Sequence, residues 1–401
     1  MANNNENKIL NVPHLRFPEF SGEWVTKSIN DLAVVIGGGT PDTTVKSYWD
    51  GEIQWFTPSE IGKNKYVDSS LRTITEVGLN NSSAKLLPPN TILLSSRATI
   101  GECSLSLREC ATNQGFQCLV SKKCNVDFLY YLIQTKKKDL IRKSCGSTFL
   151  EISANEVRKI QVSVPSDVEQ QKIAELLSLI DERIATQNKI IYKLKSLIRG
   201  IMVELQKRGL SNGTWKKVLL SNVLTERNEL NKSLYPVYSV SVIQGIVNQM
   251  EYLGRSFAAS DTSKYHVVHY GDLVYTKSPT GSFPYGIIKQ SYNQNEVAVS
   301  PLYGVYEPKT FSTGVFLHEY FKSELNTLNY LHPLVQKGAK NTINIANQRF
   351  LESYVAIPSN ANELLAISKL LCSLNTKLEF LQNILKQSQG QKQYLLRQMF
   401  I

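Results

Sequence analysis

Two stretches of the chain share one strict hydrophobic period. Apolar residues recur in alternating steps of four and three from residue 173 to residue 205, and the pattern returns 194 positions later, from 367 to 399. A 3.5-residue period held this long is typical of a coiled-coil seam. The alternative, two helices that each lie on their own domain, rarely needs so long a seam. We therefore predict a seam formed by Ile173, Leu177, Ile180, Ile184, Gln187, Ile191, Leu194, Ile198, Ile201, Leu205, Ile367, Leu371, Leu374, Leu378, Leu381, Leu385, Ser388, Lys392, Leu395 and Met399.

Shorter echoes extend this repeat to the rest of the chain. Gly-Glu-Trp at 22–24 is matched by Gly-Thr-Trp at 213–215, and Val-Ser-Val-Pro at 162–165 is matched by Val-Ala-Ile-Pro at 355–358. Self-similarity at a fixed offset indicates duplicated structural units. The chain is therefore expected to alternate a globular module with a long helix, twice.

The modules themselves have a mixed pattern. Short apolar runs at 91–95 and 272–276, bounded by turn-forming residues, predict strands, whereas 129–142 and 316–331 predict helices. We predict an α+β chain with two mixed α/β modules, each built on a twisted, half-barrel-like sheet. The predicted boundaries are 1–165 for the first module, 166–208 for the first helix, 209–359 for the second module and 360–401 for the second helix.

Connectivity predicts how the helices pair. The first helix leads into the second module and the second helix leaves it, so the second helix must turn back to bury its seam on the first. This arrangement is an antiparallel pair with an approximate internal twofold axis. At 1.5 Å per residue, residues 173–205 rise about 48 Å, against about 34 Å for one turn of B-DNA.

The composition of the chain limits the classes of molecule that it is expected to bind. The chain has 401 residues, a net charge of +11 and 42% apolar residues, which argues for real cores and against wholesale disorder. The basic balance favours an anionic partner, nucleic acid before a membrane surface. No apolar run approaches the ~18 residues of a membrane span, and the six cysteines form no CxxC pair. We expect a cytoplasmic protein with reduced, mostly buried thiols.

Motifs of catalysis and metal binding are missing from the sequence. The run Gly-Gly-Gly-Thr-Pro-Asp at 37–42 lacks the second glycine and the lysine of a phosphate-binding loop, and no HExxH or GxSxG pattern occurs. The five histidines are scattered, with only His266 and His269 close in sequence. We therefore expect a binding protein with no metal site and no cofactor of its own, and regard an enzyme with an unrecognised active site as the weakest hypothesis.

A series of short motifs runs in order through the first half. It consists of Gly-x-Trp at 22–24, Gly-Gly-Thr-Pro at 38–41, Ser-Ser-Arg-Ala-Thr-Ile-Gly at 95–101, Thr-Asn-Gln-Gly-Phe at 112–116 and Glu-Gln-Gln-Lys-Ile-Ala at 169–174. In this order, the motifs resemble the specificity subunit of type I restriction-modification systems. The second half has Glu-Leu-Asn at 229–231 where Gly-Gly-Thr-Pro would align, and its residues 235–241 resemble a different branch of the same domain.

The resemblance implies a concrete function. Such a subunit holds two target-recognition domains apart with paired helices, and each domain reads one part of a bipartite, asymmetric sequence in double-stranded DNA. It docks two modification subunits, which carry S-adenosylmethionine and methylate adenine, and through them the restriction subunits. The chain itself would catalyse nothing. A free-standing regulator with two DNA-binding modules is the alternative.

Candidate DNA contacts follow from residue type and from the motifs. Lys and Arg neutralise phosphates, while Arg, Lys, Asn and Gln can also read base edges. A structural role is equally open for each candidate, and the Lys run at 136–138 is more readily a solvated helix face than a phosphate contact. The candidates are Thr40, Thr43, Tyr48, Lys63, Lys65, Arg97, Thr99, Asn113 and Gln114 in the first half, and Lys264, Tyr265, Lys277, Ser278 and Thr280 in the second.

Overall fold

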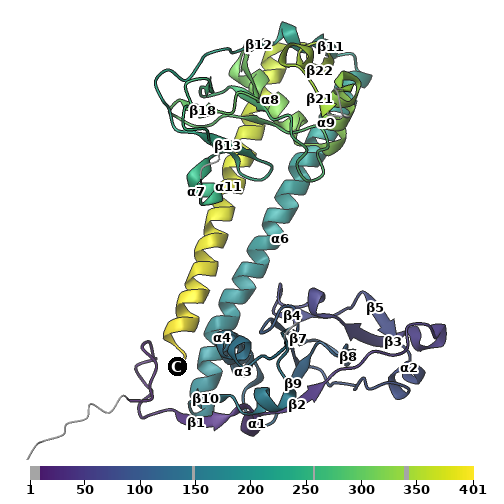
Figure 1. Ribbon diagram of the computed structural model, residues 1–401, viewed down its shortest axis with the longest axis vertical. Helices are drawn as coiled ribbons and strands as arrows, with labels where there is room; N and C mark the ends of the chain where they lie inside the picture. The colour runs from purple at the N-terminus through teal and green to yellow at the C-terminus, as the bar shows by residue number, and fades with distance from the viewer. Residues whose placement is uncertain (1–9, 147–149, 256–257, 338–342) are drawn as a thin grey trace, which may run out of the picture. The chain divides into compact units, whose positions relative to one another are not determined.

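The chain forms two compact units. A computed structural model describes residues 10–146, 150–255, 258–337 and 343–401. Unit 1 contains residues 1–189 and 383–401, and unit 2 contains residues 190–382. Two long helices, α6 (Asp167–Ser211) and α11 (Ala361–Gln398), each contribute one part to each unit (Figure 1). Unit 1 therefore combines residues from the first half of the chain with its last nineteen residues.

In unit 1, the first part of α6 packs against the last part of α11. Ile184 of α6 and Leu396 of α11 both pack on the core of this unit. Asp181 and Lys392 add an ion pair of 2.7 Å between the two helices, with side chains only 14% and 17% exposed. The buried seam residues of the cluster are Ile173, Leu177, Ile180, Leu395 and Met399. Early residues of α6 thus meet late residues of α11.

In unit 2, the reverse ends of the same helices meet. Late residues of α6 share one apolar cluster with early residues of α11, so the antiparallel pair expected from the sequence is confirmed. Every predicted seam position is buried or half-buried, whereas Leu179, Tyr192 and Phe380 on other helix faces are more than 60% exposed. The buried residues of the cluster include Ile198, Ile367 and Leu371, and Leu194, Leu205, Leu374 and Leu378 pack against it.

Unit 1 is built on an open five-stranded sheet. Its strand order is β2 (Ala33–Gly37), β9 (Gln117–Ser121), β6 (Ile92–Leu94), β7 (Cys103–Ser106) and β4 (Tyr66–Val67). A second sheet has the order β5 (Arg72–Ile74), β3 (Trp49–Phe56) and β8 (Cys110–Thr112). The helices are α1 (Ile29–Leu32), α2 (Glu76–Asn80), α3 (Val126–Thr135), α4 (Lys137–Arg142) and α5 (Ala154–Arg158).

The core of unit 1 also includes the last residues of the chain. Phe400 stacks on Phe128 of α3 with ring centroids 5.3 Å apart and meets Trp24 edge to face at 6.4 Å. Lys136 Nζ donates a hydrogen bond of 2.6 Å to the backbone oxygen of Ile401. Burial, opposed by Asp139, lowers the pKa of Lys136. This lysine therefore anchors the helix end and does not lie on a simply solvated face.

Unit 2 repeats the main sheet. Its strand order is β12 (Leu224–Glu226), β19 (Gly304–Pro308), β16 (Leu273–Tyr275) and β17 (Ile288–Gln290), which matches β2, β9, β6 and β7 in unit 1. The internal repeat is thus confirmed in the strand order. Two-stranded ladders join β13 (Tyr238–Ser241) to β14 (Gly245–Asn248), β15 (His266–Val268) to β18 (Val297–Val299), and β20 (Gln336–Lys337) to β21 (Ile343–Asn344). The helices are α7 (Gln249–Leu253), α8 (Phe311–Tyr320), α9 (Glu324–Leu331) and α10 (Asn347–Phe350).

In each unit, the first strand pairs with the strand that directly precedes a long helix. In unit 1, β1 (Val25–Ser28) pairs with β10 (Gln161–Val164); in unit 2, β11 (Trp215–Leu219) pairs with β22 (Tyr354–Pro358). The Trp24 indole donates to Glu169 at 3.3 Å, and the Trp215 indole donates to Glu363 at 2.8 Å. Each glutamate lies in the first turn of its helix, Glu169 in α6 and Glu363 in α11. The Gly-x-Trp echo therefore marks a tryptophan that fixes the start of a helix against its sheet.

Two helices predicted as continuous are each broken in two. The stretch 129–142 divides into α3 and α4 at Lys136, whose backbone N–H bonds to Ile133 O at 3.0 Å and so tightens the last turn. The stretch 316–331 divides between α8 and α9, where the Ser323 side chain accepts from Asn326 N and starts a new helix. Both breaks are set by cap geometry, which hydrophobic periodicity alone does not report.

The cysteines are thiols. Cys103, Cys110, Cys118 and Cys124 are buried, and burial raises the pKa of each to about 12. Such thiols carry almost no thiolate at neutral pH and are inert. Within the described ranges, no helix combines the length and the apolar character needed to cross a membrane.

The seam in unit 1 can be tested at Ile184. We expect Ile184→Asp to lower the free energy of unfolding by about 3 kcal/mol, because an aspartate there places an unpaired charge against the core. Leu179→Asp, at a position that is 64% exposed on the same helix, is the matched control and should change stability little. Urea unfolding followed by circular dichroism measures both. Equal stability of the two variants would contradict the paired-helix arrangement.

Candidate nucleic-acid interface

Three loops of unit 1 leave the main sheet at one edge. Gly37 at the end of β2 pairs with Gln117 at the start of β9. Ser95, just after β6, forms a bridge with Phe116, just before β9. The loops 38–45, 95–102 and 113–116 therefore emerge side by side. They contain six of the nine candidates in the first half, namely Thr40, Thr43, Arg97, Thr99, Asn113 and Gln114.

Close backbone packing joins the first and third of these loops. Gly39 N donates to Thr112 O at 2.8 Å, and a Cβ on Gly38 would lie 2.0 Å from Asn113 O. Only glycine fits such an approach. Thr40 Oγ1 then donates to Gln114 Oε1 at 2.5 Å, and Asn113 Oδ1 accepts from Gly115 N at 2.9 Å. The Gly-Gly-Thr-Pro motif thus places Thr40 beside the amides of the Thr-Asn-Gln-Gly motif.

The loop after β6 is held tightly. Arg97 O accepts from both Ser95 Oγ at 2.8 Å and Thr99 N at 2.5 Å. Ala98 has φ +53°, in the left-handed region that non-glycine residues rarely adopt. Thr99 is exposed, and its hydroxyl donates to Ser95 Oγ at 3.1 Å. The backbone therefore presents Arg97 and Thr99 in a fixed geometry.

The two lysines at 63 and 65 have different environments. Lys63 is exposed and follows Gly62, whose Cβ position faces Glu102 at the end of the 95–102 loop. Lys65 is only 6% exposed; its Nζ lies 2.6 Å from Asp127 and 2.7 Å from Ser178. Lys65 thus links the module to α6. Its ammonium group is already paired within the protein and is not available to a DNA phosphate. Its selection as a DNA contact relied on residue type, and the burial argues against it.

Thr43 and Tyr48 also differ from each other. Thr43 is exposed in the loop after β2 and keeps its side chain available. Tyr48 is half-buried and packs against the cluster of Trp49 and Trp55. Tyr48 therefore has a packing role in the second sheet of unit 1.

In unit 2, the candidates gather at the corresponding edge. Tyr275, the last residue of β16, pairs with Gly304, the first residue of β19, and Lys277 follows two positions later. His266 Nδ1 lies 3.1 Å from Tyr303 O, so β15 starts beside the same turn. Lys264 is exposed there, and the Tyr265 hydroxyl accepts from Ala259 N at 3.0 Å. The structure thus brings together residues from two sequence segments.

The loop after β16 corresponds to the Arg97 loop. β6 ends at Leu94 and β16 ends at Tyr275, 181 positions apart, and the same offset relates Arg97 to Ser278 and Thr99 to Thr280. Ser278 is exposed, and Thr280 is half-buried with its hydroxyl donating to Ser278 O at 3.1 Å. Burial lowers the pKa of Lys277, and Glu226 opposes the shift. The second edge thus has the uncharged Ser278 where the first edge has Arg97.

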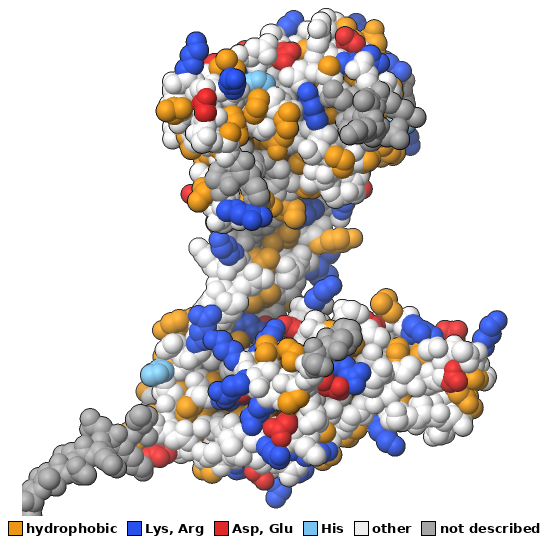
Figure 2. Space-filling view, viewed as in Figure 1, with side chains coloured by type: hydrophobic (Ala, Val, Ile, Leu, Met, Phe, Trp, Pro, Cys, Tyr) orange, Lys and Arg blue, Asp and Glu red, His pale blue; other side chains and the backbone are white. Residues whose placement is uncertain are grey.

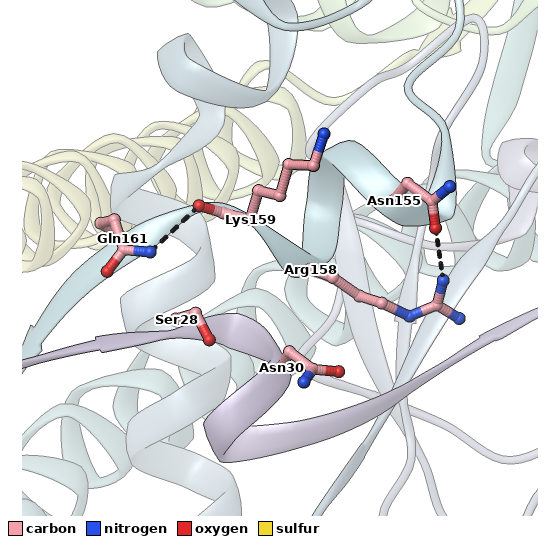
Figure 3. Close-up of a pocket in the computed structure, with 6 residues that line it drawn as sticks. All are labelled: Ser28, Asn30, Asn155, Arg158, Lys159 and Gln161. Atoms are coloured by element: carbon pink, nitrogen blue, oxygen red, sulfur yellow. Dashed lines mark hydrogen bonds between the residues drawn. The ribbon is translucent and has the colours of Figure 1, made fainter.

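An open surface pocket lies at the other end of β2, beside α1. Arg158 there donates to Asn155 Oδ1 at 2.9 Å and to Val35 O at 3.0 Å, and Lys159 pairs with Glu156 at 3.0 Å. Its cations already have partners in the protein, so we assign no ligand to it. The lining residues, shown in Figure 3, are Ser28, Asn30, Asn155, Arg158, Lys159 and Gln161.

The basic side chains on one face of the described structure are spread over both units. On the face shown in Figure 2, Lys and Arg side chains are scattered over both units and alternate with Asp and Glu. In the Lys136–Lys138 run, Lys137 pairs with Glu102, the last residue of the 95–102 loop. Scattered charge of this kind can attract phosphates without regard to sequence, whereas base selectivity requires side chains in fixed positions.

Comparison with known proteins finds relatives of the first half of the chain. Residues 21–196 match the family described as the type I restriction modification DNA specificity domain. The specificity subunit of the type I restriction enzyme MjaIX from Methanocaldococcus jannaschii is 39% identical over 180 residues, which cover 43% of this chain and 42% of that protein. The EcoR124I/EcoR124II specificity subunit from Escherichia coli is 31% identical over 175 residues, covering 42% of this chain and 43% of that protein.

A solved structure extends the likeness of the fold to the second unit. The S subunit of a type I restriction-modification system from M. genitalium matches with a TM-score of 0.60 over 97% of this chain and 99% of that chain, at 15% identity. That identity supports the fold alone. The similarity to type I restriction-modification specificity subunits is found in the first half of the chain, where the family model matches residues 21–196. The sequence resemblance is thus confirmed, although the alignments span less than half of each curated relative.

Lys65 offers a test of the structural assignment. We expect Lys65→Met to lower the free energy of unfolding by about 1–3 kcal/mol, because it leaves Asp127 and Ser178 without their shared donor. Lys63→Met, two positions away at an exposed site, should change stability by less than about 0.5 kcal/mol. Thermal unfolding of both variants measures the difference. Matching unfolding temperatures would show that Lys65 is not a structural link.

Proposed function

We propose that this chain is the DNA-reading, non-catalytic subunit of a type I restriction-modification enzyme. In this role, unit 1 and unit 2 each bind one part of a bipartite site in double-stranded DNA. The observation that carries the proposal is the family match of residues 21–196, together with the shared strand order that makes unit 2 a second module of the same kind.

The loop edges are the proposed DNA-contacting surfaces. In unit 1, the candidate contacts are Thr40, Thr43, Arg97, Thr99, Asn113, Gln114 and the exposed Lys63; in unit 2, they are Lys264, Tyr265, Lys277, Ser278 and Thr280. Amide, hydroxyl and guanidinium groups of this kind suit base edges in the major groove. Because the two edges differ in side chains, the two half-sites should differ in sequence.

The enzyme activities belong to partners in this proposal. Two modification subunits, carrying S-adenosylmethionine and methylating adenine, and the restriction subunits would dock on this chain in the cytoplasm. The exposed faces of α6 and α11, including Leu179, Tyr192 and Phe380, leave room for helix-mediated docking. A free-standing regulator would instead purify without a methyltransferase and bind an operator by itself.

An exchange of modules tests which module determines each half of the methylated sequence. We expect that replacing residues 1–165 by the corresponding domain of another specificity subunit changes one half of the methylated sequence and leaves the other half intact. Sequencing of methylated adenines in cells that co-express the modification subunits measures this directly. Replacing residues 209–359 is the reciprocal control and should change the other half. An unchanged methylated sequence after either exchange would refute the proposal.

A further inference from the structure

A backbone bridge ties the Arg97 loop to Glu151, a residue outside the motifs that point to the interface. Arg97 and Glu151 form an antiparallel bridge, and Ile152 N donates to Ser96 O at 3.1 Å. On its other side, Glu151 exchanges two backbone hydrogen bonds with Cys145, at 2.9 and 3.0 Å. Glu151 is thus the middle of a small ladder that lies against the proposed DNA-contacting edge.

The side chains of this ladder also meet. Arg97 Nη2 lies 2.8 Å from Glu151 Oε2, with the two side chains 43% and 35% exposed. An ion pair this exposed adds little to stability. Its consequence is geometric, because the Arg97 backbone is already fixed by Ser95 and Thr99 and the carboxylate contact at Nη2 draws the guanidinium to one side, while Arg97 Nε is buried without a hydrogen-bond partner.

The carboxylate also selects what Arg97 can bind. A DNA phosphate approaching the guanidinium would meet the negative charge of Glu151 and lose attraction. A guanine edge carries two neutral acceptors, O6 and N7, and its recognition needs an arginine fork held in one plane. The geometry therefore favours a base edge over a phosphate.

We propose that Glu151 is a positioning residue that holds Arg97 against a guanine in the part of the DNA site that unit 1 binds. This inference rests on the proposed function. At the corresponding positions of unit 2, Ser278 stands in place of Arg97, and the backbone ladder pairs Gln336 with Asn344, so the sequence there lacks both the arginine and the carboxylate. The effect of Glu151 is therefore confined to one half-site.

The experiment uses the full chain co-expressed with its modification subunits in cells without restriction activity. The variants are Glu151→Gln, Arg97→Gln and the double variant, and the readout is the extent of adenine methylation at every genomic site that differs from the preferred sequence by one base pair. Asp68→Asn is the matched control, because Asp68 makes a similar exposed pair with Arg108 at 2.8 Å, beyond the far end of β7.

We expect Glu151→Gln to reduce discrimination at one G·C pair of the unit 1 half-site by about tenfold, within the range of one bidentate arginine contact. Arg97→Gln should affect the same pair at least as strongly, and the double variant should equal Arg97→Gln alone. Methylation of the unit 2 half-site, the thermal unfolding temperature and the Asp68→Asn pattern should stay as in the unmodified chain.

Other outcomes overturn the inference in distinguishable ways. An unchanged pattern in Glu151→Gln removes the positioning role, and an effect that persists in the Arg97→Gln background shows that Glu151 does not act through Arg97. A uniform loss of methylation with a lowered unfolding temperature indicates structural support only. Relaxation at an A·T pair refutes the guanine assignment. If the unmodified chain directs no bipartite methylation, the proposed function itself fails, and this inference fails with it.

Discussion

The antiparallel packing of α6 against α11 is the interaction on which both units depend. In unit 1, the cluster that buries Phe128 of α3 also buries Leu395, Met399 and Phe400 from the far end of the chain. The module therefore completes its core only when the last helix has returned to it. Contacts between residues so distant in sequence are costly in chain entropy, and the long apolar seam supplies the burial that offsets this cost.

The hydrogen bonds of Trp24 and Trp215 fix each long helix to the sheet of its own unit. A buried carboxylate needs donors, and Glu169 receives them from the Trp24 indole and from Arg16, whose Nε and Nη2 each lie 2.8 Å away. Glu363 accepts from Trp215 in the same way. Each long helix is thus fixed to its sheet at its first turn. Under the proposed function such rigidity is useful, because base contacts require donors in fixed positions.

The candidate interface was partly predictable from residue type and motif. Thr40, Arg97, Thr99, Asn113 and Gln114 do lie at one sheet edge, since the motif glycines allow the loops to approach closely. Lys65 was not predictable, because its burial depends on α3 and α6 packing over it. Tyr48 is similar: an aromatic residue in a motif can serve packing as well as binding, and only the neighbouring tryptophans decide which.

The sequence by itself determined the repeat, the seam and the antiparallel return of the second helix. The repeat and the seam follow from the period of an α-helix, which is a local property of the sequence. The antiparallel return follows from the order of the elements along the chain. Only the tertiary structure decided where the helices break, at Lys136 and Ser323, because caps depend on individual hydrogen bonds. It alone brought Glu151 to Arg97, since strand order and loop packing, not spacing along the chain, bring these residues within 2.8 Å.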